Sequence, residues 1–422
     1  MDRPLPARVA LVNQPLGLFR SLAMARRNVL SIIPEIAVKQ PMVSGKMGKR
    51  WHMVMDPTAI REMLLDRVDD YPKSLVTKNL LRPAIGDSLF IVEGAHWQRS
   101  ADRIAAAGPR AINMLDEMVT STFDVISDVT FSGGDGFDRD AVHRAIDDYI
   151  AEAGKLSLFD ILGLPDWLPR PGRAMSGRAL KDMKRIADGA IDARAERGPS
   201  DTPDLLDLLL DGTDPKTKRQ MNTAELRDNL LTFIVAGHET TALTLSWALY
   251  LMGFDQAVQQ KARAEAQTVL QGRAATGADV ENLPYIRQII DETLRLYPPA
   301  GVISRTAQRN DTLCGREVRP GDTVMVPIYA LGRHQQLWDQ PDVFDPDRFK
   351  DRKAIDRYAY LPFGDGPRIC IGASFAQQEA VIILATLLSR FRFTPVAGKS
   401  PEPVMILTLR PEGGVWLTAT PA

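Results

Sequence analysis

Long stretches of the chain repeat apolar residues with the period of an α-helix. Apolar side chains at intervals of three and four residues lie on one face of a helix, where they can pack against a core. We therefore expect helices over residues 60–67, 115–129, 179–197, 223–253, 258–270 and 375–391. Such a chain is mostly α-helical.

Runs that are typical of β-strands are few and short. They cover residues 51–55, 302–306, 324–328 and 404–409, and Pro320-Gly321 marks a turn before the third of them. Strands of this length predict small sheets beside the helices. The expected fold class is therefore mainly α with small β-sheets.

Two proline-containing breaks, at 163–172 and 198–203, look like surface connections between helices. Neither is typical of a flexible linker, because helical patterns resume at once, and no repeat is evident. We expect residues 1–422 to form a single domain.

Composition narrows the function classes. A formal net charge of -1 indicates no nucleic-acid partner. No apolar run approaches the roughly 18 residues of a membrane span, so we expect no membrane anchor. The chain has two cysteines, Cys314 and Cys370, which is too few for a disulfide framework and favours a cytoplasmic protein. Cys314, next to Gly315, is expected to be a buried free thiol.

The second cysteine lies in unusual surroundings. The stretch FGDGPRICIG at 363–372 places Cys370 in a glycine-rich loop directly before a long helical segment. Gly364 and Gly366 allow the backbone to approach a flat cofactor, and amide donors at the helix start lower the pKa of a thiol. Cys370 could then bind a metal as a thiolate. The alternative is a structural cysteine in a turn.

Every specified position of this stretch matches the cytochrome P450 signature, and the chain resembles that family from about Pro15 to its end. The resemblance implies the triangular, helical P450 fold and haem b, with Cys370 as the axial ligand of the iron. The haem-contacting positions that it implies are Cys370, Phe363, Gly364, Arg368, Ile371, Gly372, Ala236, Gly237, Trp97 and Arg305.

The helix over 223–253 is interrupted by small and polar residues. Thr240 could bond back to the carbonyl of Ala236 and make room for a ligand beside Gly237. This stretch is similar to the family's Ala-Gly-x-Glu-Thr-Thr segment, which implies that Thr240 and Glu239 handle O2 and deliver protons. The alternative is a back-bonded threonine in a kinked helix.

A structural network is also implied. Glu292 and Arg295 lie three residues apart in a helical stretch, and Pro346-Asp347-Arg348-Phe349 resembles a second family segment. In the family, residues at these positions form a buried triad of Glu292, Arg295 and Arg348 that holds the cysteine loop.

One departure concerns the haem propionates. The resemblance places Trp97, Arg305 and Arg368 near them, but Ala101 stands where the family usually has Arg or His. Compensating contacts could come from His96, Arg99 or Arg103. Arg99, Arg103 and Arg110 could also form a basic docking face for a redox partner. That they form an ordinary solvent-exposed face is an equally supported alternative.

The family resemblance implies a monooxygenase that inserts one atom of O2 into a C–H bond of a small apolar substrate, such as a fatty acid, terpenoid or aromatic compound. We expect the substrate to contact the loop 75–91, Ile234, Val235, Val302, Ile303, Ile406 and Leu407. Because no flavin or iron–sulfur segment is evident, ferredoxin with its reductase, or flavodoxin, is the expected electron donor. The alternatives are a peroxygenase or isomerase on the same fold, or a non-catalytic haem sensor.

Overall fold

The structure is a computed structural model, and it describes residues 5–47, 49–72, 97–108, 110–131, 173–199, 203–213 and 218–422. The loop 75–91, His96 and the break at 163–172 lie outside this description. Within the described part of the chain, no helix is long and apolar enough to cross a membrane.

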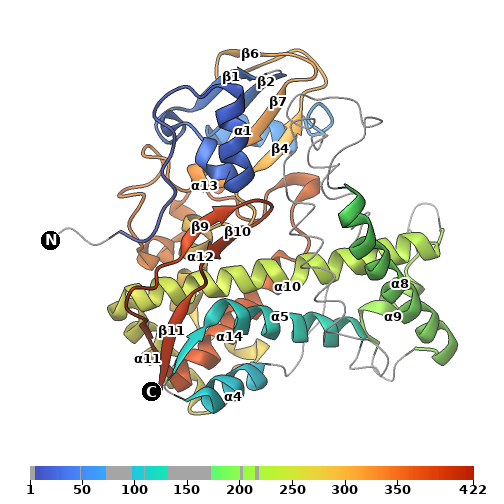
Figure 1. Ribbon diagram of the computed structural model, residues 1–422, viewed down its shortest axis with the longest axis vertical. Helices are drawn as coiled ribbons and strands as arrows, with labels where there is room; N and C mark the ends of the chain where they lie inside the picture. Colours follow the sequence, from blue (N-terminus) through green and yellow to red (C-terminus); the bar gives the residue numbers. More distant parts are fainter. Residues whose placement is uncertain are drawn as a thin grey trace.

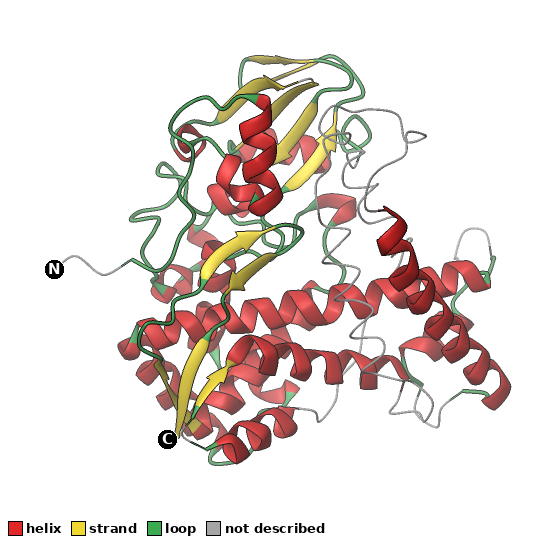
Figure 2. Cartoon of the chain, viewed as in Figure 1, coloured by secondary structure: helices red, strands yellow, loops and turns green. Residues whose placement is uncertain are grey.

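Helices make up most of the described chain (Figure 2). All six predicted helices are present, and the others are α1, α4, α9, α12 and α13. The bounds are α1 Leu18–Arg27, α2 Pro57–Arg61 followed by a π-helical turn Glu62–Asp66, α4 Trp97–Ala107, α5 Met114–Phe131, α8 Arg173–Arg197, α9 Leu205–Asp211, α10 Thr223–Phe254, α11 Gln256–Leu270, α12 Pro284–Leu296, α13 Ile328–Leu331 and α14 Ala373–Arg390.

The long helix α10 runs through the middle of the molecule and packs against α5, α8, α12 and α14 (Figure 1). It begins with a capping box, in which Asn222 and Glu225 satisfy each other's free backbone amides. It ends at Asp255, whose side chain caps the start of α11. Because both ends are fixed by these caps, the polar residues in its middle have a defined position.

The strands form small separate sheets, which confirms the expected fold class. One sheet has the order β1-β2-β7-β4, a second has β3-β11-β8, and β5–β6 and β9–β10 are two-stranded. The bounds are β1 Met42–Met47, β2 Lys49–Val54, β3 Ala111–Asn113, β4 Ile303–Thr306, β5 Asp311–Leu313, β6 Arg316–Val318, β7 Thr323–Val326, β8 Phe391–Pro395, β9 Glu402–Met405, β10 Leu409–Glu412 and β11 Trp416–Pro421.

Two local predictions were wrong. The predicted strand over 404–409 is a hairpin, in which β9 and β10 pair antiparallel and Leu409 lies opposite Met405. Its tip contains no Gly, Asn or Asp, so no turn residue marked it. Cys314 is exposed, because Cys314 and Gly315 form the turn between β5 and β6 with φ angles of 49° and 71°.

The β9–β10 hairpin is fixed to the core beside its turn. The indole Nε1 of Trp247 in α10 donates a hydrogen bond of 3.1 Å to the carbonyl oxygen of Leu409. The same indole stacks on Tyr297 with ring centroids 4.0 Å apart. The Asn28 side chain donates to the Pro403 carbonyl and accepts from the Met405 amide, both of β9. The hairpin therefore starts from a rigid support beside α10.

Candidate functional site

The cysteine loop folds back on itself before α14. The amide of Cys370 donates to the carbonyl of Phe363 at 2.8 Å, and Gly364 and Gly366 have φ angles of 70° and 73°. A Cβ atom on Gly366 would lie 2.1 Å from the carbonyl oxygen of Leu64, so no larger residue fits there. This turn leaves Cys370 exposed at the start of the helix, followed by Ile371 and by Gly372, which is the N-cap residue of α14.

The thiol of Cys370 is under two opposing influences. Desolvation by the surrounding protein raises its pKa, and a hydrogen bond from the backbone amide of Gly372 lowers it. Desolvation is the larger effect, so the expected lowering by the helix start is present but outweighed. A metal cation would supply the missing stabilisation if Cys370 coordinated it, because coordination deprotonates a thiol.

Two arginines lie together beside this loop. Arg305 of β4 is 6% exposed, and its Nε has no hydrogen-bond partner among the described residues. Burial and the positive charge of Arg368 lower the pKa of Arg305 to about 10. Arg368 also donates to the carbonyl of Tyr71 at 3.2 Å. Two like charges with an unused buried donor are an arrangement that an anionic group would stabilise.

Small residues of α10 form the third part of the site. The Thr240 hydroxyl donates to the Ala236 carbonyl at 2.9 Å, as predicted, although the helix continues without a break. Ala236 is exposed within this largely buried helix. A Cβ atom on Gly237 would lie 2.9 Å from Ile126, so glycine allows α5 to pack closely.

Glu239 is directed toward the β9–β10 hairpin. Its residue is 4% exposed, and its Oε1 accepts hydrogen bonds from the Thr408 hydroxyl at 2.8 Å and from Arg410 Nε at 2.7 Å. Arg410 Nη2 lies 2.6 Å from the same oxygen. The carboxylate is therefore part of an ion pair that the sequence did not predict, since its partners lie far away in the chain.

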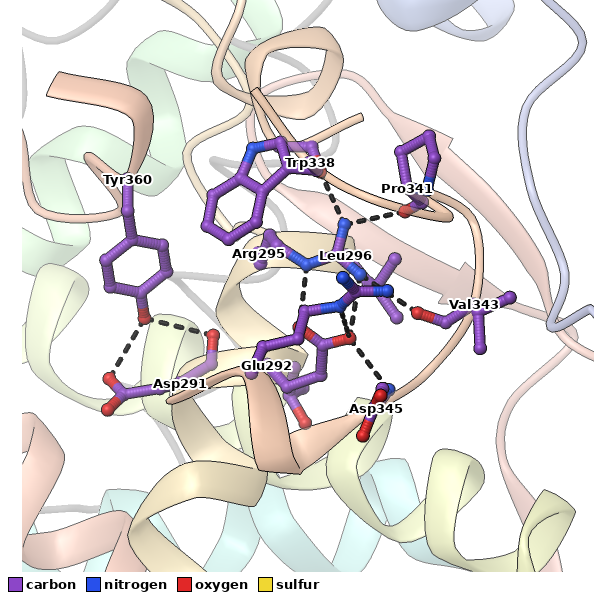
Figure 3. A network of polar contacts seen from close by, with 12 residues as sticks. Asp291, Glu292, Arg295, Leu296, Trp338, Pro341, Val343, Asp345 and Tyr360 are labelled. Carbon is purple, nitrogen blue, oxygen red and sulfur yellow. Dashed lines mark hydrogen bonds and ion pairs between the residues drawn. The ribbon is translucent and has the colours of Figure 1, made fainter. Parts of the chain in front are cut away.

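A buried network on α12 supports the loops that lead to the cysteine (Figure 3). The Arg295 guanidinium binds both oxygens of Glu292 at 2.6 and 2.7 Å. It also donates to the carbonyls of Gly332 at 2.5 Å, Pro341 at 2.6 Å and Val343 at 3.0 Å. All five N–H donors of the guanidinium are thus used.

The same helix fixes two further segments. Glu292 accepts bonds from the Asp345 amide at 2.8 Å and from Arg348 Nε at 3.3 Å, so the residues of the predicted triad lie together. Asp291, which sequence reasoning missed, accepts from the Tyr360 hydroxyl at 3.0 Å (Figure 3). Tyr360 stands shortly before the cysteine loop, and α12 therefore holds that loop at its start.

Comparison with known proteins gives the family. The profile of the family described as Cytochrome P450 matches residues 101–418. The chain belongs to the cytochrome P450 family. Two relatives from Streptomyces melanosporofaciens are cyclooctatin synthase, 30% identical over 93% of this chain and 91% of its own, and cyclooctat-9-en-7-ol 5-monooxygenase, 32% identical over 94% and 92%.

A third relative carries a second activity in its name. The bifunctional cytochrome P450/NADPH–P450 reductase 2 of Bacillus subtilis is 34% identical over 71% of this chain, and the match covers 29% of that protein. As a P450 with named monooxygenase relatives, this chain is an oxygenase, and the family uses a haem-iron cofactor, O2 and redox partners.

The residues of this P450 fit a haem. The exposed cysteine and the positive-φ glycines form one side, and the arginine pair with its unused donor suits carboxylates. The middle of α10 packs against α14, the helix that follows the cysteine, where Glu379 lies beside Thr241. Strand β4 meets the cysteine loop where the Ile303 side chain would lie 3.5 Å from a Cβ atom on Gly364.

Helix α4 is a partial exception. Trp97 begins this helix, which packs against α14, but its side chain and that of Arg99 lie outside the described residues. Ala101 is fully buried in the hydrophobic core. Arg103 binds Glu117, Asp124 and Ser121 of α5, so its charge is already used within the protein. This P450 therefore lacks Arg103 as a compensating or docking cation.

Sequence reasoning also missed Glu379. The residue is 2% exposed, and no donor among the described residues lies within 3.5 Å of either carboxyl oxygen in hydrogen-bonding geometry. Desolvation raises its pKa well above the ordinary value, and the nearby Thr241 hydroxyl, which donates to the Gly237 carbonyl at 3.3 Å, offsets only part of this effect. A glutamate nine positions after the cysteine carries no signal in its own neighbourhood, because helical spacing alone does not show what covers a side chain.

Proposed function

We propose that this P450 is a haem b monooxygenase that inserts one atom of O2 into a C–H bond of a small apolar substrate. One observation carries the proposal: the exposed Cys370 lies in a loop next to two like-charged arginines, the buried Arg305 and the exposed Arg368. The thiol suits the iron of a haem, and the two cations suit its two negatively charged propionates. When bound, haem supplies the oxygen activation.

The protein's own residues take the following roles in this proposal. The Cys370 thiolate would hold the haem iron, and Arg305, Arg368 and Trp97 would bind the propionates. Phe363, Gly364, Ile371 and Gly372 line the cysteine side, and Ala236 and Gly237 line the opposite side. Thr240 and Glu239 deliver protons. The Thr240 hydroxyl is held at the exposed surface of Ala236, which supports its assignment to the oxygen side.

The substrate class follows from the apolar residues near the site. Ile234, Val235, Val302, Ile303, Ile406 and Leu407 are the proposed contacts, and Ile406 is 37% exposed at the tip of the β9–β10 hairpin. Apolar side chains bind apolar ligands by removing water from both surfaces. A monooxygenase acting on cyclooctat-9-en-7-ol is among the relatives. Fatty acids, terpenoids and aromatic compounds all fit this class.

We further propose that residues 1–422 are one haem domain in the cytoplasm. Electrons would come from ferredoxin with its reductase, or from flavodoxin. Arg103 gives no support to a docking face for this donor, because it forms ion pairs with Glu117 and Asp124 of α5. Arg110 remains exposed on the segment before β3.

The test of the ligand assignment uses the two cysteines as a matched pair. Cys370→Ser should remove the red-shifted Soret band of the reduced carbon monoxide complex, because only a thiolate ligand produces this band. Cys314→Ser, at an exposed turn, should leave the band unchanged. The thiolate assignment is wrong if Cys370→Ser keeps the wild-type spectrum.

A ligand screen by optical spectroscopy, followed by product analysis, separates the monooxygenase from a peroxygenase and from a haem sensor. A peroxygenase would turn over fully with hydrogen peroxide, but not with NAD(P)H, ferredoxin and reductase. A sensor would change spin state with a ligand and consume none. Retention of both Glu239 and Thr240 favours the monooxygenase, since the two rivals do not need these proton donors.

A further inference from the structure

The acid assigned to proton delivery and the hydroxyl that should receive the proton point to different elements. Thr240 is bonded to Ala236 within α10, whereas the Glu239 carboxylate is held by Thr408 and Arg410 of the β9–β10 hairpin. Three donors converge on the single oxygen Oε1 of Glu239. In this arrangement Glu239 is held away from its neighbour.

The hairpin is fixed to the core beside its turn, at Leu409. The Leu409 amide donates to the Pro299 carbonyl at 2.9 Å, and the Leu409 carbonyl accepts from the Trp247 indole at 3.1 Å. Strand pairing stops at Met405 and Leu409, so residues 406–408 form the tip. Figure 1 shows β9 and β10 lying beside α10. The tip therefore carries both an exposed apolar residue, Ile406, and a donor to Glu239, Thr408.

We propose that Thr408 and Arg410 are positioning residues that hold Glu239 in a closed state, and that an apolar ligand contacting Ile406 and Leu407 opens it. This inference rests on the proposed function. A ligand can shift such an equilibrium because it binds the open tip better than the closed one. Ligand binding is thereby linked to release of the proton donor.

The ion pair reaches solvent on its Arg410 side. The Arg410 side chain is 42% exposed, whereas that of Glu239 is 5% exposed, so opening of the pair would admit water to the carboxylate. The freed carboxylate takes a proton from a hydronium ion of the solvent: an O–H bond forms at Oε1, one O–H bond of that ion breaks, and water is left. That proton passes to the Thr240 oxygen while the Thr240 hydrogen would pass to reduced O2, the co-substrate of the proposed function, so Glu239 returns to its carboxylate form. No electrons are transferred among these groups.

The test is binding of two azoles to the ferric holoenzyme, followed by the Soret shift. Imidazole carries no apolar group beyond the ring that binds, whereas 4-phenylimidazole carries a phenyl ring, which the proposal places against Ile406 and Leu407. Arg410→Gln, Thr408→Val and Glu239→Gln remove parts of the closed state. Their affinity for 4-phenylimidazole should rise by about fivefold, since the ligand no longer has to open the tip. Affinity for imidazole should stay unchanged.

Controls separate this effect from general loosening. Glu412→Gln, exposed on the same strand, and Arg410→Lys, which keeps the charge, should behave as wild type. The double variant Arg410→Gln/Glu239→Gln should match either single variant, because both remove one ion pair. An unchanged ratio of the two azole affinities in Arg410→Gln, or additive effects in the double variant, overturns the proposal. If neither azole shifts the wild-type Soret band, the haem site itself is wrong.

Discussion

The network on α12 and the haem site on α10, α14 and β4 differ in whether their buried charged groups have hydrogen-bond partners. In the α12 network both Arg295 and Glu292 are fully buried, and every guanidinium donor has an acceptor (Figure 3). In the haem site, Arg305 has an unused Nε, and Glu379 has two unused oxygens among the described residues.

This difference separates structural from functional charge. A satisfied ion pair supports the fold and needs nothing more from outside the protein. An unsatisfied buried charge costs free energy unless another group completes it, so its retention indicates a ligand or a reaction. Substitutions in the α12 network should therefore lower the free energy of unfolding most. Substitutions of the unsatisfied charges in the haem site should keep or raise the stability of the haem-free protein.

The largest expected effect is at Arg295. Lysine has three donors on one nitrogen and cannot reach the four groups that Arg295 binds, so buried carbonyls and Glu292 would lose partners. We expect Arg295→Lys to lower the free energy of unfolding by about 3–5 kcal/mol. Urea unfolding followed by circular dichroism measures this change.

The control is Arg287→Lys on the same helix, since Arg287 is exposed and has only one bond, of 3.2 Å, to Gln377. That change should cost less than about 0.5 kcal/mol. Equal effects of the two substitutions would contradict a special role for the α12 network.

A smaller effect is expected at Arg305, and its sign should depend on the cofactor. Arg305→Met removes a desolvated charge that faces Arg368, so the haem-free protein should keep or gain stability. The loaded protein should release haem about 30-fold faster, because a propionate loses a buried charged partner worth about 2 kcal/mol.

Transfer of haem to apomyoglobin measures the release rate. Arg309→Met is the matched control, because the Arg309 side chain is 78% exposed and forms a surface pair with Asp70. If Arg305→Met released haem at the wild-type rate, Arg305 would not bind a propionate.

Sequence patterns predicted the parts of the molecule whose cause is local. The helix over 223–253 was predicted within one residue of α10, because its apolar period and its capping residues lie within the segment itself. The cysteine loop and the Glu292, Arg295 and Arg348 network followed from motifs, and the structure brings the three network residues together.

What could not be predicted depends on contacts between distant segments. Arg410 lies 171 positions from Glu239 in sequence, and no residue near either one indicates the pairing. The hairpin at 404–409 has the same cause, since its turn residues carry no turn signal and the residues that flank the turn are held by Trp247 and Asn28. The burial of Glu379 likewise depends on where α14 crosses α10.

The smallest effect, per unit of pH, is expected at Glu379. Its pKa in the folded protein is raised by desolvation, so between the ordinary carboxyl pKa and the raised one the unfolded chain loses its proton first. Stability therefore falls as pH rises through this range, by at most about 1.4 kcal/mol per pH unit. Glu379→Gln cannot ionise and should remove this slope.

Thermal unfolding of the haem-free protein from pH 4 to pH 8 tests the prediction at Glu379. The glutamine variant should match wild type at the acid end and become the more stable protein toward neutral pH. Glu281→Gln, an exposed carboxylate before α12, should follow wild type throughout. If the unfolding temperatures of wild type and Glu379→Gln changed with pH in parallel, the pKa of Glu379 would not be raised in the folded protein. The contrast between the haem site and the α12 network would then depend on Arg305 alone.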